Sequence, residues 1–351
     1  MTLADLTQHA GEWLRGAGPM HDVVISSRVR LARNLAGTHF LSRCSVNQQR
    51  QLEQKMRHEL LQGSIAPEMF YVDMTSAGEL DRNLLVERQL VSRQHAEASH
   101  PRGVAISADE TISIMVNEED HLRIQVLRSG LQLSDAMANA ARIDDALEDR
   151  FEFAFHSKYG YLTACPTNVG TGLRLSVMLH LPALKIAGDM DKVFRAAGDM
   201  RLAIRGLYGE GTEASGDFYQ VSNQTTLGKS EQQYAEEFNE RLIPAFIEYE
   251  RRARRFLMDS RATAVEDRVS RAMATLRSAR MISSDETMYL LSMVRLGANL
   301  QLVEDIDLRT VNELFLLTQP AHLQKIHHRE MDRQERAECR AEMIRRRLGV
   351  G

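Results

Sequence analysis

The sequence predicts an α+β domain, in which an antiparallel sheet is flanked by helices, followed by an all-helical C-terminal domain. In the first part of the 351 residues, strand-like and helix-like segments alternate. From about residue 230 onward strand-like patterns no longer occur, whereas helical patterns continue. Mixed elements followed by a run of helices are typical of α+β proteins or of separate domains. We therefore expect one domain over residues 1–255 and a second over residues 256–351.

Strand patterns lie mainly between residues 103 and 127. Residues 103–107, 111–116 and 122–127 are largely apolar segments separated by short polar turns. Residues 111–116 alternate between apolar and polar side chains, as an antiparallel strand with one buried face does. Residues 23–25 form one more apolar segment. These patterns predict consecutive antiparallel strands and one short buried strand near the N-terminus.

Helical patterns surround these strands and fill the C-terminal part. Residues 46–62 follow Ser45, a residue type that caps helices. Residues 230–258 begin with acidic and end with basic side chains, an order that the helix dipole favours. Apolar residues at helical spacing and junction residues predict further helices over residues 133–151, 189–200, 261–280, 283–296, 308–317 and 328–348.

Composition argues against several classes of protein. The net charge of −4 and the isoelectric point near 6.3 disfavour a strongly basic nucleic-acid-binding protein. No run of 18 apolar residues occurs, so we expect no membrane span, and the first 18 residues lack the pattern of a secretion signal. Three widely separated cysteines favour neither a disulfide framework nor a metal site, and they suit the cytoplasm.

The basic residues are almost all arginines. Only six of the 44 are lysines, so 38 are arginines. A genomic codon bias explains most of this excess. Some arginines, however, can do what lysine cannot, because the planar guanidinium grips a phosphate with two parallel hydrogen bonds.

Two short segments combine charges that a phosphoryl-transfer site requires. In residues 26–30 (SSRVR), strand alternation places Arg28 and Arg30 on one face. Residues 117–123 (NEEDHLR) place an acidic cluster before Arg123, where a cationic substrate and a phosphate could both be held. Taken alone, each segment is more typical of an ordinary edge strand or polar turn.

Two later segments are rich in glycine. In residues 165–176 (CPTNVGTGLRLS), the glycines permit close approach of the backbone to a ligand, and we expect Arg174 at the entry to a helix limited by Pro182. Residues 205–217 form a glycine-rich acidic stretch that could close over a substrate. It is not a P-loop, because Asp217 stands where the lysine belongs. On their own, a lone cysteine and a flexible loop are common structural features.

Taken together and in this order, the four segments resemble the ATP:guanidino phosphotransferases, the family of arginine and creatine kinases. The similarity spans roughly residues 20–230. It implies the family's catalytic domain, with ATP and Mg²⁺ as cofactors. It also implies that Glu119 and Glu210 hold and deprotonate the substrate guanidinium beside Cys165.

The resemblance implies a nucleotide site as well. Its five arginines would be Arg28, Arg30, Arg123, Arg174 and Arg205. Gln89 stands where the family's nucleotide-contacting histidine is expected. The other implied nucleotide contacts are Ser26, Ser27, Val29, Leu175, Ser176, Val177, Met178, Gly206, Leu207, Tyr208, Gly209 and Glu210.

Two departures narrow the resemblance to the bacterial protein-arginine kinases within this family. The SSRVR segment begins at residue 26, so we expect the helical N-terminal domain of the small-guanidine kinases to be absent. A helical region also follows the catalytic domain. This similarity implies protein substrates with exposed arginines and a role in stress response and proteolytic quality control. It further implies a zinc-binding activator protein, the Clp protease system and a homodimer as partners, with no nucleic acid and no membrane.

The tail resembles the RDxxRA motif with which that group binds phosphoarginine. The matching residues are Arg336, Ala337, Glu338, Cys339, Arg340 and Ala341. Ala337 replaces the aspartate, so the carboxylate partner of the bound guanidinium is missing unless Glu338 substitutes. A solvated helix face explains the tail equally well. Two other functions stay open for the whole chain, namely a kinase of free arginine or another small guanidine, and a pseudokinase regulator. We expect no metal site, since the pair His327 and His328 has no partner at ligand spacing.

Overall fold

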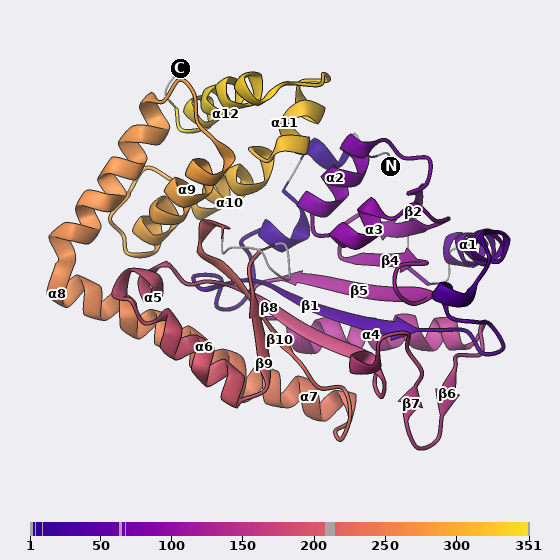
Figure 1. The fold of residues 1–351 in the computed structure, drawn as a ribbon. Coiled ribbons are helices and arrows are strands. Elements are labelled where there is room, and N and C mark those ends of the chain that lie inside the picture. Colours follow the sequence, from indigo (N-terminus) through magenta and orange to yellow (C-terminus); the bar gives the residue numbers. More distant parts are fainter. Residues whose placement is uncertain are drawn as a thin grey trace.

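The computed structural model describes residues 3, 5–8, 10–62, 65–66, 68–207 and 215–349. Within these residues, eight strands form one sheet in the order β2-β3-β4-β5-β1-β8-β10-β9, and all neighbours run antiparallel (Figure 1). The strands are β1 (Val24–Arg33), β2 (Met69–Asp73), β3 (Gly103–Ser107), β4 (Ile112–Val116), β5 (Leu122–Ser129), β8 (Leu173–His180), β9 (Leu202–Arg205) and β10 (Phe218–Asn223). A separate hairpin joins β6 (Phe155–His156) to β7 (Gly160–Tyr161).

Three of the four predicted strands are confirmed within about two residues, as β3, β4 and β5. The fourth was predicted too short. Residues 23–25 only begin β1, which continues to Arg33 through the whole SSRVR segment and lies at the centre of the sheet. Arg174 does not open a helix, since β8 runs from Leu173 to His180 and the next helix begins at Pro182.

The helices agree with the predicted ones in most places. They are α1 (Val46–Leu61), α2 (Glu79–Glu87), α3 (Arg93–Glu97), α4 (Leu133–Glu148), α5 (Pro182–Ala187), α6 (Met190–Asp199), α7 (Glu231–Glu237), α8 (Ile243–Ser278), α9 (Ser284–Asn299), α10 (Leu308–Leu317), α11 (Pro320–Ile326) and α12 (Arg333–Arg347). Ser45 caps α1 as predicted, in a reciprocal capping box with Gln48. The predicted helix over 328–348 is shorter, because α11 and α12 are separated by residues 327–332.

The two faces of the sheet differ in chemistry. On one face, Val29, Leu31, Leu175 and Val177 are buried in the main core with α1, α4 and the first half of α8. Alternation along the same strands sends Arg28, Arg30 and Arg174 to the opposite face. On that polar face the strands β1, β5, β8 and β9 carry the arginines that the sequence singles out. The alternation along the strands therefore places the main apolar core on one face of the sheet and the arginines on the other.

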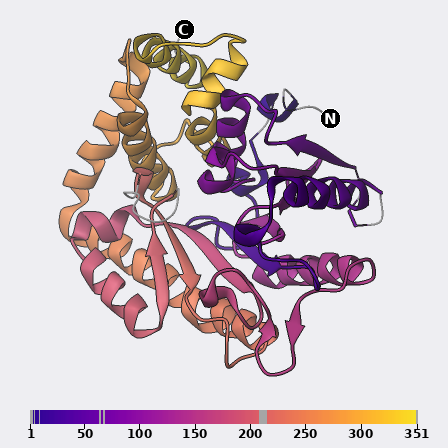
Figure 2. The same cartoon turned by 45° about the vertical axis from the view of Figure 1, so that its right-hand side comes forward.

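The C-terminal helices cover one end of the polar face (Figure 2). Leu127, Met178 and Phe218 of the sheet share a second core with side chains of α9, α10 and α12. The predicted domain boundary at 255/256 falls inside α8, whose backbone leaves helical geometry at Arg261. The division into two domains stays a prediction. No helix in the described ranges is long and apolar enough to cross a bilayer.

Candidate active site

A cleft of about 530 Å³ lies on the polar face of the sheet. Its floor is formed by the central strands, and its walls come from α3, from the loop before β5 and from the segment between β7 and β8. The lining residues are Arg30, Leu31, Ala32, Gln94, Glu119, Arg123, Cys165, Thr167, Asn168, Gly172, Leu173, Arg174, Arg205, Asn223, Gln224 and Thr226. Four of the five predicted arginines, together with Glu119 and Cys165, therefore share one cavity.

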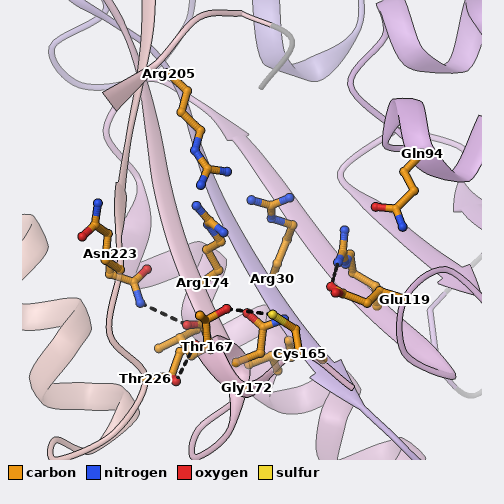
Figure 3. Close-up of a pocket in the computed structure, with 16 residues that line it drawn as sticks. Arg30, Gln94, Glu119, Cys165, Thr167, Gly172, Arg174, Arg205, Asn223 and Thr226 are labelled. Atoms are coloured by element: carbon orange, nitrogen blue, oxygen red, sulfur yellow. Dashed lines mark hydrogen bonds and ion pairs between the residues drawn. The ribbon is translucent and has the colours of Figure 1, made fainter. Parts of the chain in front are cut away.

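The guanidinium groups of Arg30, Arg174 and Arg205 gather on one side of this cleft (Figure 3). Arg30 and Arg174 are directly opposite each other in the register of β1 and β8. Arg205 ends β9, and its partner Gln220 lies on β10 next to β8. Three separate strands thus bring cations together that are far apart in the sequence.

The electrostatics of this cluster favour an anion. Burial lowers the pKa of Arg30 well below its usual value, and repulsion from Arg28, Arg123 and Arg174 lowers it further. Burial and the neighbouring cations also lower the pKa of Arg28, to about 10. The buried Nε of Arg30 has no hydrogen-bond partner among the described residues. A polyphosphate here would relieve the repulsion and accept from such a donor, so these residues fit the phosphates of a nucleotide.

Arg28 lies two residues along β1 from Arg30, beside a much smaller cavity that it shares with Ser26, Ser176 and Met178. Its Nε donates to the Oγ of Ser176 at 3.3 Å. Its two Nη atoms donate to the amide oxygens of Gln89, at 3.3 Å, and Gln220. The residue that stands at the expected histidine position therefore contacts an arginine of the cluster.

The loop between β4 and β5 fixes Arg123. Its Nη1 donates to Glu118 Oε1 at 2.8 Å, and its Nη2 lies 2.7 Å from Glu118 Oε2 and 3.3 Å from Glu119 Oε2. Glu118 also accepts from the Ser92 hydroxyl. Although burial favours the neutral acid, Arg123 and these donors lower the pKa of Glu118 below its usual value. Glu118 thus orients Arg123. The sequence predicted only an acidic cluster in this segment and no separate role for Glu118.

Glu119 is the more accessible carboxylate, with about one third of its side chain exposed to the cleft. Burial raises its pKa; Arg123 opposes this effect, but Asp120 and Glu118 add to it. Asp120 is fully buried, and its Oδ1 accepts from Asn34 Nδ2 and from the backbone N–H of Ala164, both at 2.6 Å. Glu119 therefore has both the access and the raised proton affinity of a proton acceptor.

Cys165 lines the same cleft as Glu119 and directly precedes a short 3-10 turn (Figure 3). Its Sγ is 3.0 Å from the hydroxyl of Thr167. The glycines that follow lie close to neighbouring backbone. Gly172 has a φ of +65°, and a Cβ there would lie 2.6 Å from the backbone oxygen of Ala32 on β1. Gly170, with a φ of +114°, is similarly close to the backbone of Thr226.

Other predicted nucleotide contacts lie elsewhere. The side chains of Val29, Leu175 and Val177 are fully buried on the opposite face of the sheet and do not line the cleft. Ser27 Oγ donates to the Gly130 carbonyl on that face, and Leu207 is buried against the C-terminal helices. Gly206 follows β9 directly. The predicted Tyr208, Gly209 and Glu210 lie outside the described residues.

In the tail, the structure assigns Arg340 a packing role. Its Nε and Nη1 donate to the carbonyls of Thr318, at 2.8 Å, and Ile282, at 3.0 Å, and its Nη2 donates to Ser284. Ala341 is buried in the second core. Arg336 donates to the Met331 carbonyl, while Ala337, Glu338 and Cys339 are more accessible. Phosphoarginine binding by residues 336–341 stays a prediction, but Arg340 already has three protein partners.

Several lining residues were missed by the sequence analysis. Gln94 on α3, and Asn223, Gln224 and Thr226 at the end of β10, belong to segments without a recognised motif. Gln220 is the buried partner of Arg28. Only the alternation along β10 could have placed Gln220 and Ser222 on the face of the arginines, because single amides carry no signal of their own. No cluster of three or more metal-ligating side chains occurs in the described part of the chain.

Comparison with protein families agrees with this arrangement. Residues 51–253 match the C-terminal catalytic domain of the ATP:guanido phosphotransferases, and residues 262–350 match the C-terminal domain of the protein-arginine kinase McsB. A protein-arginine kinase of Symbiobacterium thermophilum is 49% identical over 341 residues, which are 96% of each chain. A protein-arginine kinase of Halothermothrix orenii is 43% identical over 352 residues and 100% of each chain.

Solved structures show the same fold. The duplicated taurocyamine kinase of Schistosoma mansoni with bound transition state analog components superimposes with a TM-score of 0.60 and 31% identity. The match covers 71% of this chain and 36% of that one. Lombricine kinase gives a TM-score of 0.54 at 24% identity, over 71% of this chain and 70% of that one. The structural matches confirm the predicted fold class. The match to the family model and the similarity to the protein-arginine kinases confirm the predicted family resemblance.

Proposed function

Because the chain belongs to the ATP:guanido phosphotransferase family, we propose that it transfers the γ-phosphoryl group of ATP to arginine side chains of proteins. The products would be ADP and protein phosphoarginine. The observation that carries this proposal is the cleft in which clustered guanidinium groups face Glu119 and Cys165. Relatives named protein-arginine kinase, similar over nearly their whole length, support the choice of acceptor.

The arginines would bind and orient the nucleotide. Arg30, Arg174 and Arg205 would contact phosphate oxygens and stabilise the charge that spreads over the transferring group, with Arg28 and Arg123 beside them. Mg²⁺ would be held through the phosphates and supplies further charge neutralisation. Positioning by planar forks matters here because in-line transfer tolerates little misplacement.

The acceptor poses a different problem, because a guanidinium is cationic, with a pKa above about 12. Glu119 would align one nitrogen of the acceptor guanidinium with the γ-phosphorus and accept the proton of that nitrogen. In that step an N–H bond breaks, an N–P bond forms and the bond from the γ-phosphorus to ADP breaks. Glu210 would be the second carboxylate, as the resemblance implies, and Cys165 would lie alongside the acceptor.

The two other candidate functions predict different behaviour. A kinase of small guanidines would phosphorylate free L-arginine, and a pseudokinase would phosphorylate nothing. All five arginines and Glu119 are present, which favours an active enzyme. The activator protein, the Clp protease system, the homodimer and the role in stress response stay predictions.

The test is to incubate the purified chain and MgATP with unfolded casein or with free L-arginine. Mass spectrometry should find phosphate on casein arginines and little on the free amino acid. Samples are kept out of acid, because protonation of the P–N bond cleaves phosphoarginine. Phosphorylation of free L-arginine alone, or of serine, threonine or tyrosine alone, would contradict the proposal.

A matched pair of variants tests the proton acceptor. Glu119→Gln should bind ATP but lose casein phosphorylation by about 10²-fold or more. Glu152→Gln, at an exposed carboxylate outside the cleft, should retain the wild-type rate. Equal single-turnover rates for Glu119→Gln and the wild type would remove Glu119 from the chemistry.

A further inference from the structure

A buried contact joins the C-terminal helices to the end of α2. Helix α11 packs against α2, and Glu87, the last residue of α2, accepts from two backbone N–H groups of α11. The N–H of Ala321 lies 2.8 Å from Oε1, and that of His322 lies 3.1 Å from Oε2. Only 8% of Glu87 is exposed, so its carboxylate depends on these donors.

His322 links Glu87 to the next residue along the chain. Its Nδ1 is 2.7 Å from Glu87 Oε2, and its Nε2 is 3.1 Å from Arg88 Nη1. Because a guanidinium can only donate, Nε2 accepts and Nδ1 carries the proton. Arg88 is fully buried and is also paired with Glu110 at 2.8 Å. The imidazole therefore fixes two consecutive side chains at once.

Helix α2 ends in a defined backbone turn directly at these two residues. The N–H of Gln89 donates to the Val86 carbonyl at 2.9 Å, and the N–H of Leu90 donates to the Leu85 carbonyl at 3.0 Å. This is the hydrogen-bond pattern of a Schellman motif, in which glycine usually occupies the left-handed position. Here Gln89 occupies it, with a φ of +60°. Gln89 therefore carries a side chain at a backbone position that favours glycine.

The side chain of Gln89 contacts Arg28, one of the five arginines predicted to bind the nucleotide. Its Oε1 accepts from Arg28 Nη1 at 3.3 Å, and its Nε2 donates to the Leu207 carbonyl, at 3.4 Å, just after β9. Its backbone carbonyl accepts from Gln125 Nε2 on β5 at 2.8 Å. Arg28 is therefore held in part by the turn at the end of α2, together with Ser176 and Gln220. His322 contacts the two side chains that directly precede this turn.

We propose that His322 is a positioning residue for nucleotide binding. By holding Glu87 and Arg88 it fixes the turn that ends α2, and Gln89 of this turn orients Arg28 toward the phosphates. The C-terminal helices thereby contribute to ATP affinity without touching the nucleotide. This inference rests on the proposed ATP site.

The test compares ATP binding, measured by calorimetry, with kcat and the KM for ATP in the full chain. His322→Ala should weaken ATP binding and raise KM by about 5-fold, with a smaller change in kcat. His322→Asn retains an N–H at the level of Nδ1 and should restore most of the affinity. His322→Gln places its amide nearer Arg88 and should not restore the affinity. If the alanine variant does not fold, the comparison of His322→Gln with His322→Asn replaces it.

A double-mutant cycle tests the route. Gln89→Gly suits the left-handed backbone, so it should remain folded while it weakens ATP binding. If His322 acts through Gln89, adding His322→Ala to Gln89→Gly should weaken binding by less than about 2-fold more. Independent, multiplying effects of the two substitutions would overturn the proposal.

Lys325→Ala is the matched control, because Lys325 lies on the same helix and pairs with Asp81 of α2, away from the turn. It should leave ATP affinity unchanged. Wild-type affinity in His322→Ala, or an equal loss in Lys325→Ala, would overturn the inference. A wild-type chain that does not bind ATP would instead contradict the proposed function, so the two failures are distinguishable.

Discussion

At the scale of single residues, geometry distinguishes arginines that carry the same charge. Arg123 spans both oxygens of Glu118 and reaches Glu119, whereas Arg340 spans two carbonyls and a hydroxyl. Both arrangements use the fixed fork of the guanidinium, which a lysine ammonium cannot reproduce. The first lies in the cleft and the second in a helical core, although the two residues look alike in the sequence.

Arg123→Lys is therefore expected to lower the single-turnover rate of phosphorylation about 10-fold or more although it preserves the charge, because Glu118 and Glu119 lose a common partner. Single-turnover phosphorylation of unfolded casein measures this. Arg128→Lys is the control, since Arg128 lies on the same strand but pairs with Asp135 at the surface. Similar rates for both variants would show that charge alone suffices at position 123.

The sequence could predict the charged residues of the site but not their partners. Arg28, Arg123 and Glu119 stand in recognisable segments, so resemblance placed them. Gln89 and Gln220 orient Arg28 from the turn after α2 and from β10. The sequence singled out Gln89 only because it stands where a histidine is expected, and nothing in an isolated glutamine indicates a contact with Arg28. These contacts are decided by the packing of segments that are far apart in the sequence, which local patterns do not show.

At the scale of elements, the wrong prediction around Arg174 has a different cause. In β4 the alternation was readable, and its neighbours followed from the turns between them. In β8, residues 173–177 (LRLSV) also alternate between apolar and polar side chains, as a strand does. The prediction instead placed Arg174 at the entry to a helix limited by Pro182, whereas the helix begins only at Pro182, after the strand. Helix α1, by contrast, was predicted from its cap because Ser45 signals locally.

Helix α12 offers a stability prediction at this scale. Arg340→Met keeps an unbranched apolar stem but removes the guanidinium, so the carbonyls of Thr318 and Ile282 lose their buried donor. The free energy of unfolding should fall by about 2–4 kcal/mol. Urea titration measures it, with Arg336→Met as the comparison, since Arg336 makes one hydrogen bond to the Met331 carbonyl. An unchanged urea midpoint for Arg340→Met would restore Arg340 as a candidate ligand-binding residue.

At the scale of the whole molecule, a buried polar network connects the sheet to the C-terminal helices. His180 at the end of β8 accepts from Arg295 of α9 through Nδ1 at 2.8 Å and donates to Ser292 of α9 through Nε2 at 2.9 Å. Ser292 in turn donates to Asp217 at 2.6 Å. This arrangement requires a neutral imidazole, because a proton on Nδ1 would face the Arg295 guanidinium.

This network predicts how stability depends on pH. Burial lowers the pKa of His180 well below 6.5, and Arg295 and Arg254 lower it further; burial likewise lowers the pKa of His95, to about 4. Below pH 6.5 the unfolded chain therefore binds protons that the folded chain rejects. Each such histidine makes the free energy of unfolding fall by up to about 1.4 kcal/mol per pH unit as the pH decreases.

Urea titrations at pH 7.5 and 5.5 should show this fall, and His180→Gln should reduce it, because the amide keeps a donor for Ser292 but does not titrate in this range. The loss should begin with the contact between sheet and helices, since His180 lies at that contact while His95 packs within the sheet domain. An identical pH dependence in the wild type and His180→Gln would contradict the assignment of a neutral, buried His180. In that case the contact between the sheet and the C-terminal helices would not depend on the protonation of His180 in this pH range.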